Sequence, residues 1–570
     1  MSIQKAIQWQ IILAYFTFIT ISLVSSTPPE DPLKCSSGNK NCIIKNAYGA
    51  FNDRSICRAG SVEYPTTEEQ LVSIVANATK RQRKIKVVTS TSHSIPKLVC
   101  PDGENGLLIS TKYLNSVVHL DKSDMTITVE TGMTFRQLID ESARAGLAIP
   151  CAPFWWGLTV GGLISTGAHG SSLWGLGSAI HEYIVRLRIV TPAGPSEGFA
   201  KVRTLENGDP ELDAAKVSLG VLGVISQVTL QLQPMFKRSI TYKEKSDSDL
   251  GDAALIFGRQ HEYGDFTWYP SIPSNTSGDG VYDFIGSRST STAILATLRA
   301  TEETQEALGD ANGKCLVGAT SRFTLALAAY GLTNNGILFK GYPVIGYNHK
   351  VQSAGTCLDS PQDLLLSACP WDPRIKGLFF HHTAVSIALS KVKYFIEDVQ
   401  KLVDLSPKAL CGLEIYDGIL MRYIKASSAY LGKPEDAIEF DMVYYRSKDP
   451  NRPRLFEDIL EEIEQMAVVK YGGIPHWGKN RILAFDGVIK KFKNADKFLK
   501  IKQLYDSMGL FSSEWTDQIL GLKNGTSIVK EGCGLEGLCI CSQDIHCAPN
   551  RGYFCRSGKV YRDARVCTKL

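Results

Sequence analysis

Two short stretches of small polar residues constrain this chain more than any other feature of its sequence. The first, residues 87–100, reads VVTSTSHSIPKLVC, and residues 86–88 at its start are typical of the end of a buried strand. Successive backbone N–H groups in such a turn form a concavity that binds anions such as a pyrophosphate. The second, residues 159–171, reads TVGGLISTGAHGS, and its glycines let the backbone approach a ligand closely. The pair predicts a cofactor site, although it is not a Rossmann fingerprint, because no GxGxxG pattern opens a helix after the first strand.

Together the two loops resemble those of the vanillyl-alcohol-oxidase-type (PCMH-type) FAD-binding domain, whose patterns are GxGHS and VGGxxxxGxHG. The resemblance implies FAD as the cofactor and a covalent bond from His93 to the flavin 8α-methyl carbon. The chain departs from the pattern at Ser90 and Ser92, where the family has glycines that adopt positive φ freely. The cofactor contacts implied in the two loops are Ser90, Thr91, Ser92, His93, Ser94, Thr159, Gly161, Gly162, Ser165, Thr166, Gly167, His169 and Gly170.

Helices and strands alternate around these loops. Capping-box patterns at Thr67/Gln70 and Thr134/Gln137 predict two helices. Strands are predicted at 85–88, 107–110, 125–130, 184–191 and 221–232. The resemblance places Gly223, Val224 and Ile225, with Gly220, along the flavin. The predicted fold class is α+β: a two-subdomain PCMH-type FAD-binding domain, an α+β cap (substrate) domain and a disulfide-rich C-terminal tail.

The second half of the chain carries a different motif. We expect an FAD-binding domain at 27–240, a cap domain at 241–470, a return to the flavin site at 471–526 and a Cys-rich tail at 527–570. The HWGK motif at 476–479 resembles that of the aldonolactone oxidoreductases, in which its Lys faces the substrate or the flavin. The resemblance implies active-site roles for Lys479 and His476. A fixed ammonium group there would stabilise the negative charge of a reduced flavin.

The same branch uses an acid and an arginine two residues apart on one strand. The nearest match is Tyr444 with Arg446, in the predicted strand 439–446. Because Tyr stands where the pattern has Glu, the acid is missing or supplied elsewhere, with Asp441 and Glu439 as candidates on the opposite face of the strand.

The implied activity is FAD-dependent oxidation of L-gulono-1,4-lactone at C2, with molecular oxygen as the acceptor and ascorbate and hydrogen peroxide as products. The set of motifs looks most like the plant gulonolactone oxidase-like proteins. Two alternatives stay open: an oxidase or dehydrogenase of another sugar, alditol or cytokinin-like substrate, and a non-catalytic extracellular binding protein on the same scaffold. A net charge of +4 over 570 residues gives no case for nucleic acid.

The N-terminus and the cysteines point to the secretory pathway. An apolar run from Ile11 to Val24, with Val24 and Ser26 at the −3 and −1 positions, predicts a cleaved signal peptide at 1–26 and no stable membrane span afterwards. Sequons at Asn77, Asn275 and Asn524 fit that route to the apoplast or cell wall, with the vacuole as an alternative. In such a compartment the 15 cysteines are expected to form disulfides rather than a zinc site, including three bridges in the tail and a second cluster around Cys35, Cys42 and Cys57.

Overall fold

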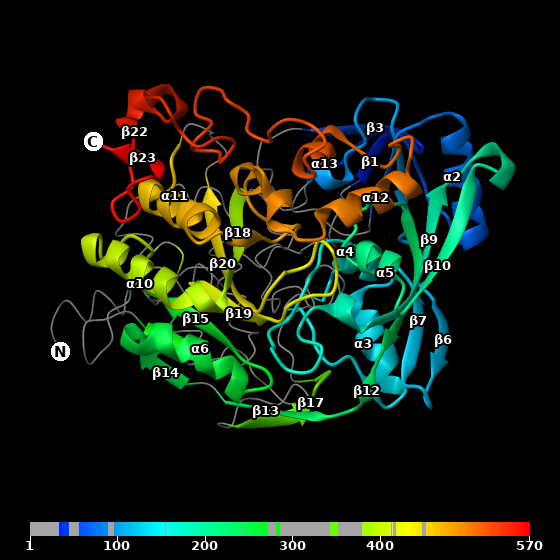
Figure 1. Cartoon of the computed structure of the whole chain (residues 1–570), viewed down its shortest axis with the longest axis horizontal. Helices are drawn as coiled ribbons and strands as arrows, with labels where there is room; N and C mark the ends of the chain where they lie inside the picture. The colour runs from blue at the N-terminus through cyan, green and yellow to red at the C-terminus, as the bar shows by residue number, and fades with distance from the viewer. Residues whose placement is uncertain are drawn as a thin grey trace, which may run out of the picture.

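The computed structural model shows two halves that lie side by side, with the N-terminal elements at the right of Figure 1 and the later sheet at the left. It describes residues 33–44, 56–88, 96–153, 156–241, 243–271, 281–284, 343–350, 379–411, 413, 418–446 and 452–570. Among these residues, no helix is both long and apolar enough to cross a membrane.

The N-terminal half contains two five-stranded sheets. The first has the order β1-β2-β3-β5-β4 and pairs β5 in parallel with both β3 and β4. Its strands are β1 (Leu33–Ser37), β2 (Lys40–Ile44), β3 (Cys57–Glu63), β4 (Ile85–Val88) and β5 (Leu107–Ser110). The second sheet is antiparallel, in the order β10-β9-β11-β7-β6. Its strands are β6 (Val117–Asp121), β7 (Thr126–Glu130), β9 (Ile184–Pro192), β10 (Ala200–Glu206) and β11 (Val224–Gln231).

The helices of this half begin where the capping patterns predict. Thr67 accepts a hydrogen bond from the Gln70 N–H at the start of α2 (Glu68–Lys80). Thr134 and Gln137 form a complete capping box at the start of α3 (Phe135–Arg144). Each cap satisfies backbone donors that a helix N-terminus leaves unpaired. Shorter helices follow at α4 (Val160–Ser165) and α5 (Pro210–Ala215).

The second half is built on a seven-stranded sheet in the order β14-β16-β15-β19-β20-β18-β21. Its strands are β14 (Lys243–Ser246), β15 (Asp265–Tyr269), β16 (Val281–Phe284), β18 (Phe379–Ala388), β19 (Ile419–Ile424), β20 (Ala437–Arg446) and β21 (Ile474–Pro475). Helices α6 (Leu250–Gln260) and α10 (Leu389–Leu405) pack against each other and cover it. Two short antiparallel pairs are separate from these sheets: β8 (Leu147–Ala148) with β12 (Gln233–Pro234), and β13 (Lys237–Ile240) with β17 (Val344–Tyr347).

Late segments of the chain return to the N-terminal half. Helix α12 (Ala495–Tyr505) packs on α5, and α13 (Glu514–Ile519) packs on the turn at 96–99. The Ile85 N–H at the start of β4 donates to the Leu510 carbonyl at 2.8 Å. The segment that carries the HWGK motif therefore joins the two halves.

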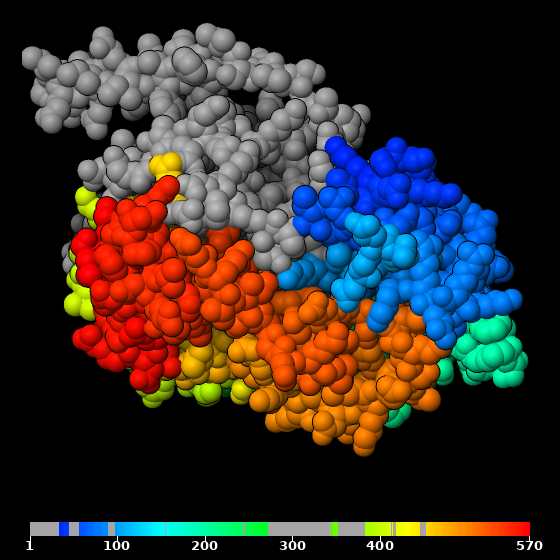
Figure 2. All heavy atoms as spheres, turned by 90° about the horizontal axis from the view of Figure 1, so that it is seen from above, coloured from blue at the N-terminus to red at the C-terminus, as the bar shows by residue number. Residues whose placement is uncertain are grey.

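The Cys-rich tail docks on α11 (Glu457–Gln465), and it forms the red end of the molecule in Figure 2. The Glu462 carboxylate accepts backbone N–H groups from Lys559, Val560 and Tyr561, each at 2.6 Å. Gln465 exchanges two hydrogen bonds with the backbone of Arg565 on β23 (Arg565–Lys569), which pairs with β22 (Tyr553–Ser557). Hydrogen bonds to a charged carboxylate are stronger than neutral ones, so these contacts hold the tail firmly.

Disulfides form, as the sequence analysis expects. Bridges with both cysteines among the described residues include Cys35–Cys42, Cys57–Cys100, Cys533–Cys539, Cys541–Cys555 and Cys547–Cys567. Tail thiols close enough to hold a metal ion, with His546 in one group, are therefore consumed in bridges. Cys151 is a free, buried thiol.

The buried Glu461 makes stability depend on pH. Burial, reinforced by nearby Glu457, raises the pKa of Glu461 to about 8, although the Cys567 N–H donates to it. When burial raises the pKa of a carboxyl in the folded state, its contribution to stability is fully present below the pKa it has in the unfolded chain. That contribution is lost as the pH rises through the folded-state pKa. Glu461→Gln keeps an acceptor but no charge. We expect its melting temperature to rise relative to the unaltered protein between about pH 5 and pH 8.

The control for this measurement is Glu435→Gln, because Glu435 is exposed. Thermal melts at several pH values should show the unaltered pH dependence in this control. A parallel pH dependence in Glu461→Gln and the unaltered protein would contradict the assignment.

Candidate functional site

Two buried carboxylates on the middle of β20 organise the site. Glu439 is fully buried and Asp441 is 7% exposed. Residues two apart on a strand share a face, so both point the same way. The neighbouring strands β18 and β19 flank them, and β19 places Arg422 directly opposite Glu439. Two adjacent carboxylates stay ionised in such a place only if cations surround them.

Glu439 is paired on both of its oxygen atoms. Arg422 donates from Nη2 to Oε1 at 2.6 Å, and the Nε2 atom of His169 lies 3.0 Å from Oε2. Burial alone would raise the pKa of Glu439, but His169 and Arg422 outweigh it and hold that pKa well below the ordinary value. His169 belongs to the second Gly-rich loop, so its contact with Glu439 connects the N-terminal half to the seven-stranded sheet.

Asp441 carries the other cations. Lys479 donates from Nζ to Oδ2 at 2.6 Å, Arg422 donates to the same oxygen at 3.0 Å, and the Nε2 atom of His382 contacts Oδ1. Burial opposes ionisation here too, but His382, Lys479 and Arg422 hold the pKa of Asp441 below its ordinary range. The HWGK lysine is therefore fixed by a buried carboxylate and is not a freely solvated surface charge.

Hydrogen bonds fix the protons of two histidines. The Nδ1 atom of His169 lies 2.9 Å from the Gly170 carbonyl oxygen, which can only accept, so Nδ1 carries a proton. The Gly478 N–H donates to Nδ1 of His476 at 3.0 Å, so the neutral His476 ring carries its proton on Nε2. Burial lowers the pKa of both rings, that of His476 strongly. The two ring centroids are 5.8 Å apart.

The same residues resemble a metal site in distance but not in chemistry. Ligand atoms of His169, Glu439 and His476 lie within 4.8 Å of one another. However, Nδ1 of His476 already accepts a hydrogen bond and its Nε2 carries the proton. Arg422 already neutralises Glu439, and a second cation beside the guanidinium would be repelled. The cluster is better described as an ion-paired network.

A pocket opens beside this network, between the second Gly-rich loop and the HWGK segment. It encloses about 320 Å³, including space open to solvent. Thr166, Gly167 and His169 line one side, and His476 and Trp477 line the other. The structure thus brings together two motifs that lie far apart in the sequence.

Buried polar atoms around the second loop fit a polar cofactor. Among the described residues, Thr159 Oγ1, Ser218 Oγ and Nδ1 of His181 are buried without a hydrogen-bond partner. Buried polar atoms are normally satisfied, so unsatisfied ones around this loop indicate a ligand site, and His181 also lines the pocket. These residues would offer hydrogen bonds to the phosphate and ring oxygens of FAD, so the site fits that cofactor.

Gly161, Gly170 and Gly223 lie where other atoms leave little room for a side chain. A Cβ atom at Gly170 would approach the Ala152 carbonyl oxygen to 2.4 Å. Gly223 has φ +148°, and a Cβ atom there would lie 2.4 Å from the Val190 carbonyl oxygen. Gly161 donates to the carbonyl of Thr131, whose hydroxyl donates to the carbonyl of Ile225. Thr159–Ser165 and the start of β11, Val224 and Ile225, therefore meet at Thr131, while Gly162 lies within α4.

Other predicted site residues have different positions. Ser90, Thr91, Ser92, His93 and Ser94 lie outside the described residues, and so does the side chain of Arg446. Tyr444 is buried on the opposite face of β20 from the two carboxylates, and its hydroxyl accepts the Leu455 N–H at 2.6 Å. His169, which lines the pocket, contacts the other face of β20, the one that carries Glu439 and Asp441.

The sequence analysis did not predict four residues of the site: Arg422, His382, Lys433 and His181. Arg422 is a lone cation in the apolar strand ILMRYI, and that isolation is the one signal that could have revealed it. Lys433 lines the pocket and donates to the carbonyls of Ile474 and Pro475. Burial lowers the pKa of Lys433 to about 8.

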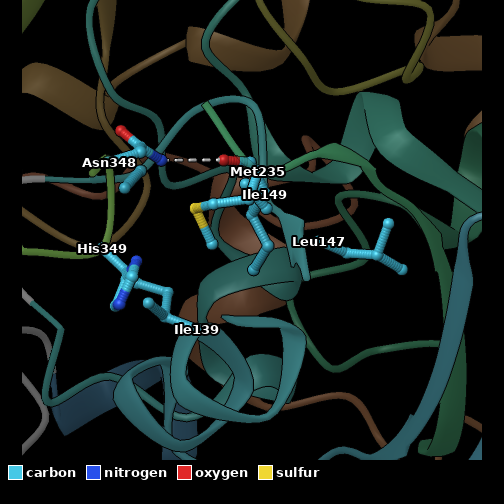
Figure 3. A pocket seen from close by; sticks show the side chains of 8 residues that line it. Ile139, Leu147, Ile149, Met235, Asn348 and His349 are labelled. Atoms are coloured by element: carbon cyan, nitrogen blue, oxygen red, sulfur yellow. Dashed lines mark hydrogen bonds between the residues drawn. The ribbon is translucent and has the colours of Figure 1, made fainter. Parts of the chain in front are cut away.

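A second pocket, of about 230 Å³, lies away from this cluster and is mostly apolar. Figure 3 shows Ile139, Leu147, Ile149 and Met235 around it, with the Asn348 amide donating to the Ile149 carbonyl. His349 is the one ring at its edge that could carry a charge, and burial lowers its pKa. It offers no charged group comparable to the Glu439–Asp441 pair.

Comparison with protein families defines the class. An FAD binding domain model matches residues 60–196, a D-arabinono-1,4-lactone oxidase model matches 378–519, and an L-gulonolactone oxidase 2-like C-terminal domain model matches 530–569. The chain is thus an FAD-binding oxidoreductase. It belongs to the L-gulonolactone oxidase family.

Two Arabidopsis thaliana relatives show the family over nearly the whole chain. L-gulonolactone oxidase 5 is 60% identical and covers 99% of this chain and 98% of its own length. L-gulonolactone oxidase 2 is 59% identical and covers 98% and 96%. A solvent-stable cholesterol oxidase structure shares the fold, with a TM-score of 0.61, 16% identity, and coverage of 87% of this chain and all of its own. These matches confirm the predicted fold class and cofactor.

Removing the charge of Glu439 tests the network directly. Glu439→Gln removes one of the two counter-charges of the buried Arg422 and the carboxylate beside His169, and breaking a buried pair typically costs about 3 kcal/mol. We expect the free energy of unfolding in urea at neutral pH to fall by that amount. The exposed Glu531→Gln serves as the control and should change it by less than about 0.5 kcal/mol. A loss in Glu439→Gln as small as that of the control would contradict the ion-paired description.

Proposed function

We propose that this protein oxidises L-gulono-1,4-lactone at C2 and uses molecular oxygen as the acceptor, with ascorbate and hydrogen peroxide as products. The observation that carries the proposal is Lys479, which Asp441 fixes three residues after His476; His476 lines a pocket together with the second Gly-rich loop. The names of the Arabidopsis relatives support the substrate, and the matched D-arabinono-1,4-lactone oxidase model supports the aldonolactone class.

Residues of the cluster supply distinct parts of this chemistry. FAD, held beside the second Gly-rich loop, would supply a two-electron acceptor for oxidation of the carbinol, with oxygen as the final acceptor. Lys479 provides a fixed positive charge where negative charge develops. Glu439 and His169 form a carboxylate–imidazole pair that can accept the hydroxyl proton and stabilise the resulting imidazolium. His476, protonated on Nε2, can donate a hydrogen bond to a lactone oxygen.

The identity of the electron acceptor is the most specific part of the proposal. A Mycobacterium tuberculosis relative, 24% identical over 82% of this chain, is named an L-gulono-1,4-lactone dehydrogenase. An artificial acceptor that outperforms oxygen by a large factor would therefore favour a dehydrogenase with the same substrate. Hydrogen peroxide formed in equal amount to the lactone consumed would support the oxidase.

A visible spectrum of the purified protein tests the proposal. We expect a yellow protein whose colour stays in an acid-precipitated pellet, through a His93 linkage, and is bleached by L-gulono-1,4-lactone without oxygen. Lys479→Met should slow this bleaching by about 100-fold, the usual loss when a fixed transition-state charge is removed. The exposed Lys490→Met should bleach at the unaltered rate.

Other outcomes of this measurement would change the substrate, the covalent linkage or the function that we propose. A yellow protein that the lactone fails to bleach would move the substrate to another sugar, alditol or cytokinin-like molecule. Colour lost from the pellet would remove the covalent bond alone. A colourless protein would contradict the proposed enzymatic activity and would favour a non-catalytic extracellular binding role.

We also propose that the chain is secreted to the apoplast or cell wall. The disulfides support passage through an oxidising compartment, and Asn77 and Asn524 are exposed, whereas Asn275 lies outside the described residues. N-terminal sequencing of the protein from plant cells should begin at Thr27, and glycosidase treatment should lower its mass. A mature N-terminus at Met1 with no attached sugar would contradict secretion.

A further inference from the structure

The small disulfide loop Cys533–Cys539 encloses the side chain of Arg481. This guanidinium is almost completely buried and pairs with Glu464. Its Nη1 atom lies 3.3 Å from the Leu535 carbonyl and 3.5 Å from the Gly534 carbonyl, both inside the loop. The loop therefore supplies acceptors for a charge that would otherwise be costly to bury.

The loop backbone lies directly on the stem of Arg481. Gly537 has φ +66°, and a Cβ atom there would come within 2.5 Å of both Cδ and Nε of Arg481. The Leu483 N–H donates to the Gly537 carbonyl at 3.0 Å, which adds a backbone contact between the loop and the segment that carries Arg481. A side chain at Gly537 would have to displace Arg481, the loop or both.

Arg481 follows Lys479 by two residues, and the residue between them is anchored as well. Asn480 has φ +79°, a left-handed conformation that Asn tolerates better than most residues. Its amide exchanges two hydrogen bonds with the backbone of Ala384 on β18, at 2.8 and 2.9 Å. The chain direction at Lys479 is thus set by β18 on one side and by the disulfide loop on the other.

A second path joins the tail to the carboxylate cluster through α11. Glu464 also accepts a hydrogen bond from the Thr383 hydroxyl at 2.8 Å. Thr383 is adjacent on β18 to His382, whose ring contacts Asp441. Arg481 and Asp441 are therefore connected in two ways: along the backbone from Arg481 to Lys479, and through Glu464, Thr383 and the β18 backbone to His382.

We propose that the Cys533–Cys539 loop is a positioning element of the active site, which acts through Arg481 to hold Lys479 against Asp441. The proposal deepens the proposed function and rests on it, because Lys479 is taken as the group that faces the flavin. Arg481 is a positioning residue, since its own contacts are with Glu464 and the loop. The tail is then part of the catalytic structure and not an appended module.

The test compares two disulfides of the same tail. The Cys533→Ser/Cys539→Ser double variant opens the loop around Arg481, and Gly537→Ala presses on the same stem with the disulfide intact. The matched control is Cys541→Ser/Cys555→Ser, because that bridge is equally buried and makes no described contact with Arg481. Arg481→Lys keeps the charge but loses the forked geometry. Flavin content and melting temperature establish which variants are folded.

The main readout is the affinity of the bound flavin for sulphite, which forms an anionic adduct that a nearby fixed cation stabilises. We expect the loop variant, Gly537→Ala and Arg481→Lys to bind sulphite about tenfold more weakly, in the direction of Lys479→Met. The kcat for lactone should fall by a similar factor with little change in KM, and the control bridge variant should match the unaltered protein in both measurements.

Several results would overturn the proposal. Folded, flavin-loaded Gly537→Ala or Arg481→Lys with unaltered sulphite affinity and kcat would do so, even if the cysteine variants fail to fold. Equal losses in the control bridge variant would show that the whole tail acts only on stability. If the unaltered protein binds sulphite but is not bleached by lactone, the substrate proposal fails separately while the sulphite comparison still decides this one.

Discussion

The ionisation of Glu439 and Asp441 inside the protein is the constraint on which the site depends. Two carboxylates side by side on β20 cannot stay charged in a buried position without partners, and none of those partners comes from β20 itself. Two are cations, Arg422 from β19 and Lys479 from the HWGK segment, and two are histidine rings, from the second Gly-rich loop and from β18. Satisfying one pair of acids therefore forces both halves of the molecule and a late chain segment to meet at one place.

This arrangement also explains how the chain prepares a polar site before any ligand enters. Charges that are already fixed by partners need not reorganise when negative charge develops, which is the main physical source of electrostatic catalysis. Arg422 holds both acids, Lys479 projects from the HWGK turn, and the protons of His169 and His476 are set by backbone groups. Buried carboxylates have the same fixing role at the tail, where those of α11 bind the tail backbone and Arg481.

The sequence predicted the fold better than the site. Capping boxes at Thr67 and Thr134, apolar periodicity and the loop motifs are local signals, and the structure confirms the elements that they predict. Lys479 and His476 were predicted because a motif surrounds them, whereas Arg422 and His382 have no motif and reach the site through strand register alone. Glu439 and Asp441 were only candidates, since alternation shows that they share a face but not which face meets the Gly-rich loop. Long-range pairing of this kind is not encoded in any short window of residues.

A crystal structure of the FAD-loaded protein with a bound aldonolactone would test the central claim most directly. The account predicts that the isoalloxazine ring and the lactone occupy the pocket between the second Gly-rich loop and the HWGK segment. Lys479 should face the flavin, and Glu439 with His169 should face the carbinol of the lactone. A flavin ring bound elsewhere, with the Glu439–Asp441 network out of contact with both ligands, would contradict it and reduce the network to a device for joining the two halves.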